Sequence, residues 1–135
     1  MRKDRQKSGF TLLEIIVVIL IVAVLAGLAL PRFFRTVEYS RGMEALTNLG
    51  SIRQAMQRCY LFDNSYVNCT LSDLDIEDPG TAPNALFSYA VSGQTASAFL
   101  ITANRNTAQN GDGTSTITID QDGNRGGTGV YSSIR

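Results

Sequence analysis

A chain of 135 residues is long enough for one domain and short for two. Its 12 basic and 12 acidic side chains cancel, but residues 1–9 carry a net charge of +3 and residues 10–135 a net charge of −3. A mildly acidic body argues against nucleic acid as the main partner, because phosphate binding requires a basic surface. The absence of histidine removes the commonest general base and metal ligand, so we expect no enzymatic activity, no metal and no cofactor.

A basic leader, residues 1–9, precedes a long apolar run at residues 10–30 that contains one charge, Glu14. A helix of this length spans about 30 Å, the thickness of a bilayer core, and its apolar side chains surround it on all sides. The dense positive charge before the run predicts a cytoplasmic N-terminus. A secretory signal cleaved near residues 26–29 and an uncleaved signal anchor are alternatives, but neither explains the carboxylate.

The residues that follow the leader, Gly9-Phe10-Thr11-Leu12-Leu13-Glu14, give the run a more specific meaning. With the leader and the apolar helix, they resemble the class III signal of the type IV pilin family, which includes pilins, minor pilins and the pseudopilins of type II secretion. The resemblance is close over about the first 33 residues. It implies that a prepilin peptidase cuts between Gly9 and Phe10 and that the new amino group of Phe10 is methylated. A glycine suits the cut, because it lets an extended segment enter a narrow site.

Glu14 gains a role from the same resemblance. An ionised carboxylate near the end of a membrane helix costs about 2–3 kcal/mol or more unless it is paired. In a filament of this family the amine of a neighbouring Phe10 would be the partner, and such a pair fixes the register of the subunits. The alternative is a glutamate that reaches the lipid headgroups, since it lies four positions from Phe10.

Pro31 follows the run, at a point of the helix where many pilins also carry a proline. It lacks an amide hydrogen and clashes with the preceding turn, so we expect it to kink or locally unwind the helix. The alternative is that Pro31 only marks the end of the membrane segment.

Residues 31–62 resume a helical pattern. Apolar side chains recur at one helical face, at Ala45, Leu49, Ile52, Met56, Cys59 and Tyr60. This pattern predicts that the helix runs from Phe10 to about Phe62 and that its amphipathic second half packs on a globular head.

Residues 63–85 are rich in acids, proline and glycine and predict a connecting loop. If the chain beyond residue 31 lies outside the inner membrane, as the resemblance implies, Cys59 and Cys69 meet an oxidising compartment and form a disulfide. In the cytoplasm they would be free thiols. The bond would stabilise the head by about 2–3 kcal/mol on the chain-entropy model. Many type IV pilins place their disulfide nearer the C-terminus.

Residues 86–135 predict the sheet of the head. Apolar and polar residues alternate in three segments, with apolar positions at Phe87, Tyr89 and Val91, at Phe99, Ile101 and Ala103, and at Ile117 and Ile119. Turn residues between them predict an antiparallel meander that covers the apolar helix face, and the tail Thr128–Ile134 predicts an edge strand. Residues 120–124 share ligand spacing with a calcium loop but lack its later glutamate, so we favour a turn.

Together these features predict an α+β, type IV pilin-like fold: a long N-terminal helix packed on a small antiparallel sheet. The resemblance implies a structural pilus subunit that forms a homopolymer. Its partners would be a prepilin peptidase and methyltransferase, an inner-membrane assembly platform and membrane lipid. The precursor would cross the bacterial inner membrane once, before it enters an extracellular pilus or a periplasmic pseudopilus. The alternatives are a type II secretion pseudopilin and a single-pass anchored binding protein, which predicts a monomer uncut at Gly9.

Overall fold

The computed structural model describes residues 9–134. Its contacts divide the chain into two units, residues 1–36 and residues 37–135, and one helix, α1 (Leu12–Asp63), supplies residues to both. The strands are β1 (Phe87–Ser92), β2 (Leu100–Arg105), β3 (Thr116–Asp120) and β4 (Arg125–Gly127). The short 3₁₀ helices are η1 (Leu71–Asp73), η2 (Pro79–Thr81), η3 (Ala108–Asn110) and η4 (Gly129–Tyr131).

In the first unit, α1 consists mainly of leucine, isoleucine, valine and alanine, and all of its side chains up to Thr36 are exposed. The assigned helix continues through Gly27 and Pro31 without a break. We expected a kink because proline removes one backbone hydrogen bond from a helix interior. The continuous helix shows no local unwinding at Pro31, and the kink stays a prediction.

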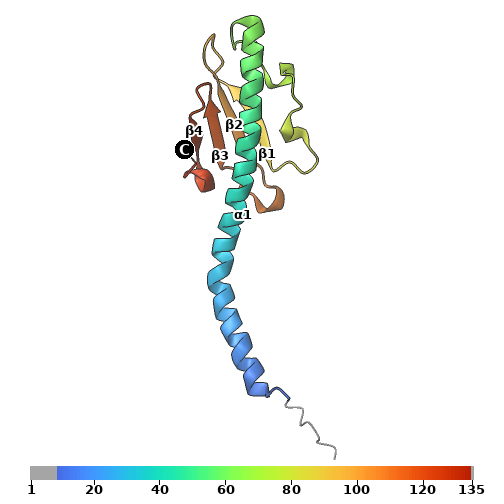
Figure 1. Ribbon diagram of the computed structural model, residues 1–135, viewed down its shortest axis with the longest axis vertical. Coiled ribbons are helices and arrows are strands. Elements are labelled where there is room, and N and C mark those ends of the chain that lie inside the picture. Colours follow the sequence, from blue (N-terminus) through green and yellow to red (C-terminus); the bar gives the residue numbers. More distant parts are fainter. Residues whose placement is uncertain (1–8, 135) are drawn as a thin grey trace, which may run out of the picture. The chain divides into compact units, whose positions relative to one another are not determined.

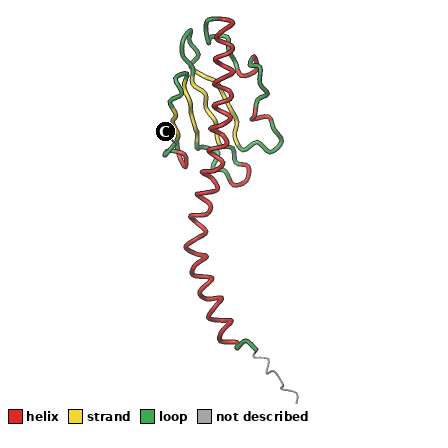
Figure 2. Tube along the Cα trace, viewed as in Figure 1, coloured by secondary structure: helices red, strands yellow, loops and turns green. Residues whose placement is uncertain are grey.

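In the second unit, α1 has one buried face and one exposed face. The buried residues recur at helical spacing, at Gly42, Ala45, Leu46, Leu49, Ile52, Ala55 and Met56. They lie on one face of the sheet, with the strands behind this part of α1 in Figure 1 and Figure 2. The predicted apolar helix face is therefore the helical half of the core, although Cys59 and Tyr60 at its end are only partly buried.

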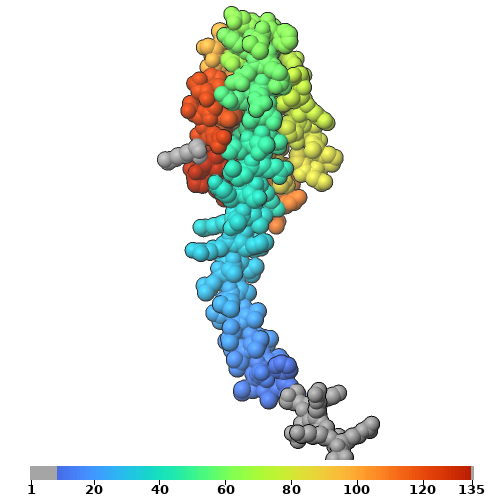
Figure 3. All heavy atoms as spheres, in the orientation of Figure 1, coloured from blue at the N-terminus to red at the C-terminus, as the bar shows by residue number. Residues whose placement is uncertain are grey.

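The sheet has the order β1-β2-β3-β4, and every neighbouring pair is antiparallel. Side chains alternate between its two faces, and those turned to the helix are Phe87, Tyr89, Ile101, Ala103, Arg105, Ile117 and Ile119, all buried. The predicted fold, a long helix packed on an antiparallel meander, is confirmed. In Figure 3 this part of α1 covers the sheet in the front view.

The connection between β3 and β4 is a tight turn. The Asp120 carboxylate accepts hydrogen bonds from the backbone amides of Asp122 (3.0 Å) and Asn124 (2.8 Å) and from the Asn124 side-chain amide (2.8 Å). These bonds lower the pKa of Asp120, with the Asn124 side chain as the largest cause. The Asp120 carboxylate therefore stabilises the turn between β3 and β4, and residues 120–124 form a turn, as we favoured over a calcium loop.

The tail differs from expectation. The fourth strand is β4, and the segment from Thr128 to Ile134, expected as an edge strand, forms η4 and places Tyr131 and Ile134 in the core. Gly129 explains the difference: its φ is +59°, and a Cβ there would lie 2.0 Å from the Ser115 hydroxyl. A strand cannot continue through this left-handed conformation.

The end of α1 is fixed by a local turn and a disulfide. Asn64 has a φ of +50° and donates its backbone amide to the Tyr60 carbonyl at 2.7 Å, which is how asparagine terminates a helix. Cys59 and Cys69 are joined, with their Cα atoms 6.1 Å apart. The following loop adds Tyr66 and Leu74 to the core.

Candidate functional site

The residues implicated in cleavage and assembly lie at the start of α1. Gly9 and Phe10 precede the helix and are exposed, Phe10 by 79%. Glu14 is in the first helical turn and is exposed. Among the described residues, nothing donates a hydrogen bond or forms an ion pair to its carboxylate. The predicted cleavage site at Gly9 and Phe10 and the carboxylate of Glu14 are therefore close in sequence and exposed.

The helix start contains one residue that the sequence reasoning missed. The Thr11 hydroxyl accepts a hydrogen bond from the Glu14 backbone amide at 3.2 Å. This is the N-cap bond of a Thr-x-x-Glu sequence, a recognised signal for a helix start. Glu14 therefore also lies at the positive end of the helix dipole, which favours a carboxylate there.

The helix after Glu14 is apolar and uncovered. An 18-residue window of α1 has a mean hydropathy of 3.1, and none of it is buried. Every residue from Ile15 to Leu30 is exposed. Such a surface requires lipid or another apolar helix around it, and length and composition alone are compatible with a membrane span.

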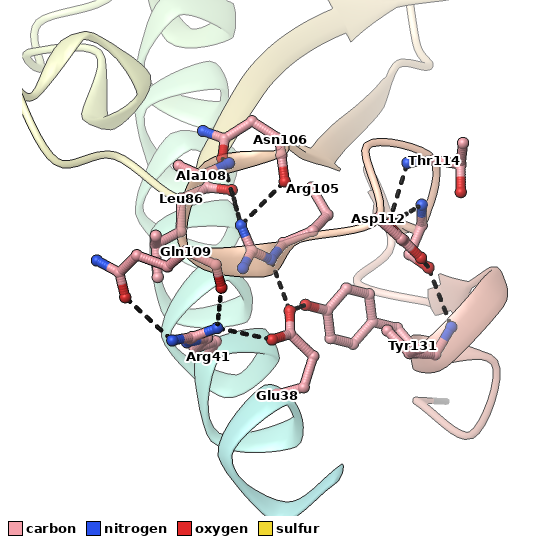
Figure 4. Close-up of polar contacts among 12 residues, drawn as sticks. Glu38, Arg41, Leu86, Arg105, Asn106, Ala108, Gln109, Asp112, Thr114 and Tyr131 are labelled. Atoms are coloured by element: carbon pink, nitrogen blue, oxygen red, sulfur yellow. Dashed lines mark hydrogen bonds and ion pairs between the residues drawn. The ribbon is translucent and has the colours of Figure 1, made fainter. Parts of the chain in front are cut away.

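A second polar site lies inside the head, around Glu38 (Figure 4). Glu38 Oε1 accepts hydrogen bonds from Arg105 Nε and from the Tyr131 hydroxyl, each at 2.6 Å. Its other oxygen accepts from Arg41 Nη1 at 2.9 Å. We call Glu38, Arg41, Arg105 and Tyr131 the Glu38 cluster. It joins α1 to the end of β2 and to the C-terminal η4.

Arg105 is the buried member of this cluster, with 1% of its surface exposed. Its Nη1 donates to the carbonyls of Leu86 and Asn106, each at 3.1 Å, while Nη2 has no partner within the described residues. Gly111 packs against the guanidinium so closely that a Cβ there would lie 2.5 Å from Arg105 Cζ. A buried arginine that lost its carboxylate would therefore have no access to water.

The loop around Gln109 closes the site. Arg41 donates to the Gln109 carbonyl at 3.1 Å and to its side-chain oxygen at 3.0 Å. Gln109 and Asn110 have φ values of +50° and +63°, a conformation that is uncommon for residues other than glycine. The contacts with Arg41 hold this loop against the helix.

The charges of the cluster depend on one another. Burial raises the pKa of Glu38, but the hydrogen bonds from Arg105, Tyr131 and Arg41 outweigh burial and hold the pKa below its ordinary value. Burial, followed by the bond to Glu38, raises the pKa of Tyr131 well above that of a free tyrosine. Glu38 is therefore a carboxylate and Tyr131 a neutral donor at physiological pH.

Sequence reasoning missed this cluster, although one signal was present. The alternation that predicts Ile101 and Ala103 to point toward the helix places Arg105 on the same face. A buried arginine requires a carboxylate, but nothing local identifies Glu38, which is 67 positions away in the sequence. The cluster is a structural site that holds the head together.

Two family models match this chain. One, described as the prokaryotic N-terminal methylation motif, covers residues 4–30. The other, described as "Type IV minor pilin ComP, DNA uptake sequence receptor", covers residues 31–118, more than half of the chain. Together they span the apolar helix and most of the head.

Curated relatives come from both branches of the family. Type II secretion system core protein G of Aeromonas hydrophila is 36% identical over 83 residues, which cover 60% of this chain and 57% of that protein. Type IV major fimbrial protein FimA of Dichelobacter nodosus is 32% identical over 76 residues, which cover 53% of this chain and 47% of FimA. The chain thus spans about half the length of the curated relatives it matches.

A solved structure has the same fold. The non-core minor pilin PilV of Neisseria meningitidis matches with a TM-score of 0.54 and 22% identity, over 72% of this chain and 89% of that one. The chain belongs to the type IV pilin and pseudopilin family. This family is structural and not enzymatic, which confirms the prediction that the chain is not an enzyme.

Proposed function

We propose that the chain is a structural subunit of a type IV pilus. Its precursor rests in the inner membrane, is cut after Gly9, methylated at Phe10 and polymerised through the first half of α1. One observation carries the proposal: residues 15–30 form a helix that is apolar and exposed on all sides, and the one carboxylate at its start, Glu14, has no ion-pair partner among the described residues.

Assembly would satisfy both features of this helix. Packing among copies removes its side chains from solvent, and each large apolar side chain shielded from water contributes about 1.5–3 kcal/mol. The amino group of a neighbouring Phe10 supplies the positive charge that Glu14 lacks within its own described chain. A buried pair of this kind penalises every other register, because a shifted subunit leaves both charges unpaired.

A type II secretion pseudopilin is the second candidate. The 36% identity to core protein G of A. hydrophila favours it. The pilus subunit is supported by the head, because the family model described as a minor pilin extends over residues 31–118 and so includes most of the head. Both candidates require cleavage, methylation and assembly. They differ in the location of the filament, which is outside the cell for a pilus and in the periplasm for a pseudopilus.

The charge of the head bears on a further role. The matching family model is described as a receptor for a DNA uptake sequence. Residues 37–134 of this chain hold five arginines, no lysine and ten carboxylates. Four of these arginines (Arg41, Arg53, Arg58 and Arg105) donate hydrogen bonds to oxygens of the chain itself. Because DNA affinity depends on free basic groups, this head supports a filament role and not a DNA-binding one.

Mass spectrometry of the mature chain tests the proposal. The expected first residue is N-methylated Phe10, and filaments sheared from the cell surface should contain the chain. Recovery of the chain only from short periplasmic assemblies would identify the pseudopilin. An intact Met1 in cells with an active prepilin peptidase, together with a monomeric state, would overturn the proposal in favour of an anchored binding protein.

A further inference from the structure

The four residues that follow Pro31 in α1 are basic and aromatic. Arg32, Phe33, Phe34 and Arg35 are consecutive residues of α1, and all are exposed, the two aromatic side chains by 61% and 64%. Successive residues of an α-helix project about 100° apart. These four side chains therefore surround the helix as a ring, and we call them the Arg32–Arg35 collar.

The collar is basic, and within residues 9–134 no acid pairs with its arginines. Neither arginine forms an ion pair with any residue in the described part of the chain. The next acid along α1 is Glu38, and both of its oxygens already accept hydrogen bonds in the Glu38 cluster. Two arginines with five donors each thus face outward beside two aromatic rings.

Arginine and aromatic side chains in this order, directly after an apolar run, match the chemistry of a lipid headgroup layer. In helices that lie at a membrane surface, phenylalanine enters the boundary between headgroups and acyl chains while arginine stays on the polar side, and guanidinium groups form bidentate bonds with phosphate. The rest of the head, residues 37–134, carries five basic and ten acidic side chains, so an anionic membrane surface would repel it. The collar, directly before the head, carries two positive charges and no negative charge, so it attracts such a surface.

We propose that the Arg32–Arg35 collar binds anionic phospholipid headgroups and fixes the depth of the precursor in the membrane. This inference deepens the proposed function, because it concerns the subunit before it leaves the bilayer. Its occupant is a lipid phosphate layer and not a second copy of the chain.

The distance along the helix from the collar to Glu14 places the predicted cleavage site at the opposite membrane surface. Arg32 lies eighteen positions after Glu14, about 27 Å along the helix, and a bilayer core is about 30 Å thick. When the collar lies in one headgroup layer, Glu14 lies at the edge of the opposite one. The bond between Gly9 and Phe10, just before the helix, then meets the membrane surface where a peptidase can reach it.

The sequence contains no tryptophan, so one introduced tryptophan is a unique fluorophore. The full chain carrying Phe33→Trp is reconstituted in vesicles of phosphatidylcholine and phosphatidylglycerol, in which only one of the two lipids is brominated near the carbonyl end of its acyl chains. The collar predicts stronger quenching by brominated phosphatidylglycerol than by brominated phosphatidylcholine at equal mole fraction, with a relative association constant of about five per arginine. In Arg32→Gln/Arg35→Gln with Phe33→Trp, the preference should disappear while quenching remains.

Phe62→Trp is the matched control. Phe62 is an aromatic residue of the same helix that is 90% exposed, and in the head it should be quenched by neither lipid. Equal quenching of the tryptophan at position 33 by both lipids, a preference that survives loss of both arginines, or quenching only by bromine near the methyl end of the chains would each overturn the inference. So would an emission shift that depends on the protein-to-lipid ratio, because it would mean that a second copy covers the collar.

The outcome is independent of assembly. The reconstituted chain needs neither cleavage nor methylation, so lipid preference can hold even if Phe10 is never methylated in cells. Conversely, filaments of methylated subunits with no lipid preference at position 33 would leave the proposed function standing and refute the collar.

Discussion

Two glutamates on the same helix are treated in opposite ways. Glu38 accepts three hydrogen bonds from its own chain, and two of its donors are arginines. Glu14 accepts none from the described residues, although its backbone amide is capped by Thr11. The head satisfies its charge when it folds, whereas the apolar half of α1 leaves its charge for a partner. The comparison indicates that one region is complete as a monomer and the other is not.

The surfaces of the two regions differ in the same way. Residues 37–134 form a core of 18 buried hydrophobic residues, but the described residues before Val37 have no buried side chain. Short isolated helices are marginal in water, and an exposed apolar helix is an interaction surface. Two kinds of substitution test this division. One removes the carboxylate that a partner would pair with, and the other removes contacts that the head makes within itself.

Glu14→Ala should have the largest effect. Removing a charge from the apolar run leaves membrane insertion intact, but it leaves the amine of a neighbouring Phe10 unpaired inside the filament. Loss of one partner of a buried pair costs about 3–5 kcal/mol, so surface filaments should be absent while the membrane pool of the chain is unchanged. Glu44→Ala, at an exposed glutamate of the same helix, is the control. Wild-type amounts of sheared filaments from Glu14→Ala would mean that Glu14 has no assembly role.

Glu38→Gln should damage the head instead. Arg105 would keep its buried charge without a carboxylate, and because Glu38 is itself 20% exposed, we expect a loss at the lower end of the usual range, about 3 kcal/mol. Urea unfolding of the purified full chain in detergent, followed by near-ultraviolet circular dichroism of its tyrosines, measures this loss.

The double variant Glu38→Gln/Arg105→Met sharpens this test. It removes the isolated charge, so its loss should be smaller than the sum of the two single losses. Glu44→Gln supplies the baseline. A Glu38→Gln chain as stable as Glu44→Gln would show that the cluster does not stabilise the head.

Removal of the disulfide should have the next largest effect. Cys59 and Cys69 close a short loop at the end of α1, and replacing both by serine should lower the free energy of unfolding by about 2–3 kcal/mol on the chain-entropy model. Reduction of the wild-type chain should shift the same unfolding curve by a similar amount. An unchanged midpoint in both experiments would assign the stability of this end of the head to packing around Tyr66 alone.

Alanine substitutions at two glycines of α1 should have smaller effects, and each serves as the control for the other. A Cβ at Gly42 would lie 2.7 Å from the Tyr131 ring, whereas a Cβ at Gly50 would meet nothing within 4 Å. Gly42→Ala should therefore cost about 1–3 kcal/mol through overpacking, and Gly50→Ala should stabilise the helix by about 0.5–1 kcal/mol. Thermal unfolding of the two variants should move in opposite directions. Equal shifts would mean that η4 does not pack on the helix at Gly42.

Much of this division was readable in the sequence, for a physical reason. The apolar run, the amphipathic half of α1 and the alternation in β1, β2 and β3 are local patterns imposed by helix and strand geometry. The Thr11-x-x-Glu14 cap is also local and could have been predicted. These patterns establish the fold.

The Glu38 cluster and the path of the tail could not be predicted in the same way. Tyr131 and Glu38 are 93 positions apart, and their contact depends on the turn at Gly129, which has a left-handed φ and leaves no room for a Cβ beside Ser115. Arg105 continued a visible alternation, but its partner is fixed only when the sheet packs on α1. Tertiary packing therefore decides where the head places its charges.

The pH dependence of stability is the smallest expected effect, and it tests the ion pairs and hydrogen bonds that the head supplies to Glu38. The pKa of Glu38 is held below its ordinary value of 4.5 in the folded head, so the unfolded chain binds the proton first as pH falls. The stability contributed by Glu38 is thus fully present above pH 4.5 and declines as the pH falls below that value toward the folded pKa. Asp112 and Asp120 have pKa values lowered by hydrogen bonds within their own turns and add to the same slope. Glu38→Gln should flatten the acid limb of the profile without abolishing it, because Asp112 and Asp120 still contribute. An acid limb of Glu38→Gln that is as steep as that of the wild-type chain would mean that the Glu38 cluster does not lower the pKa of Glu38.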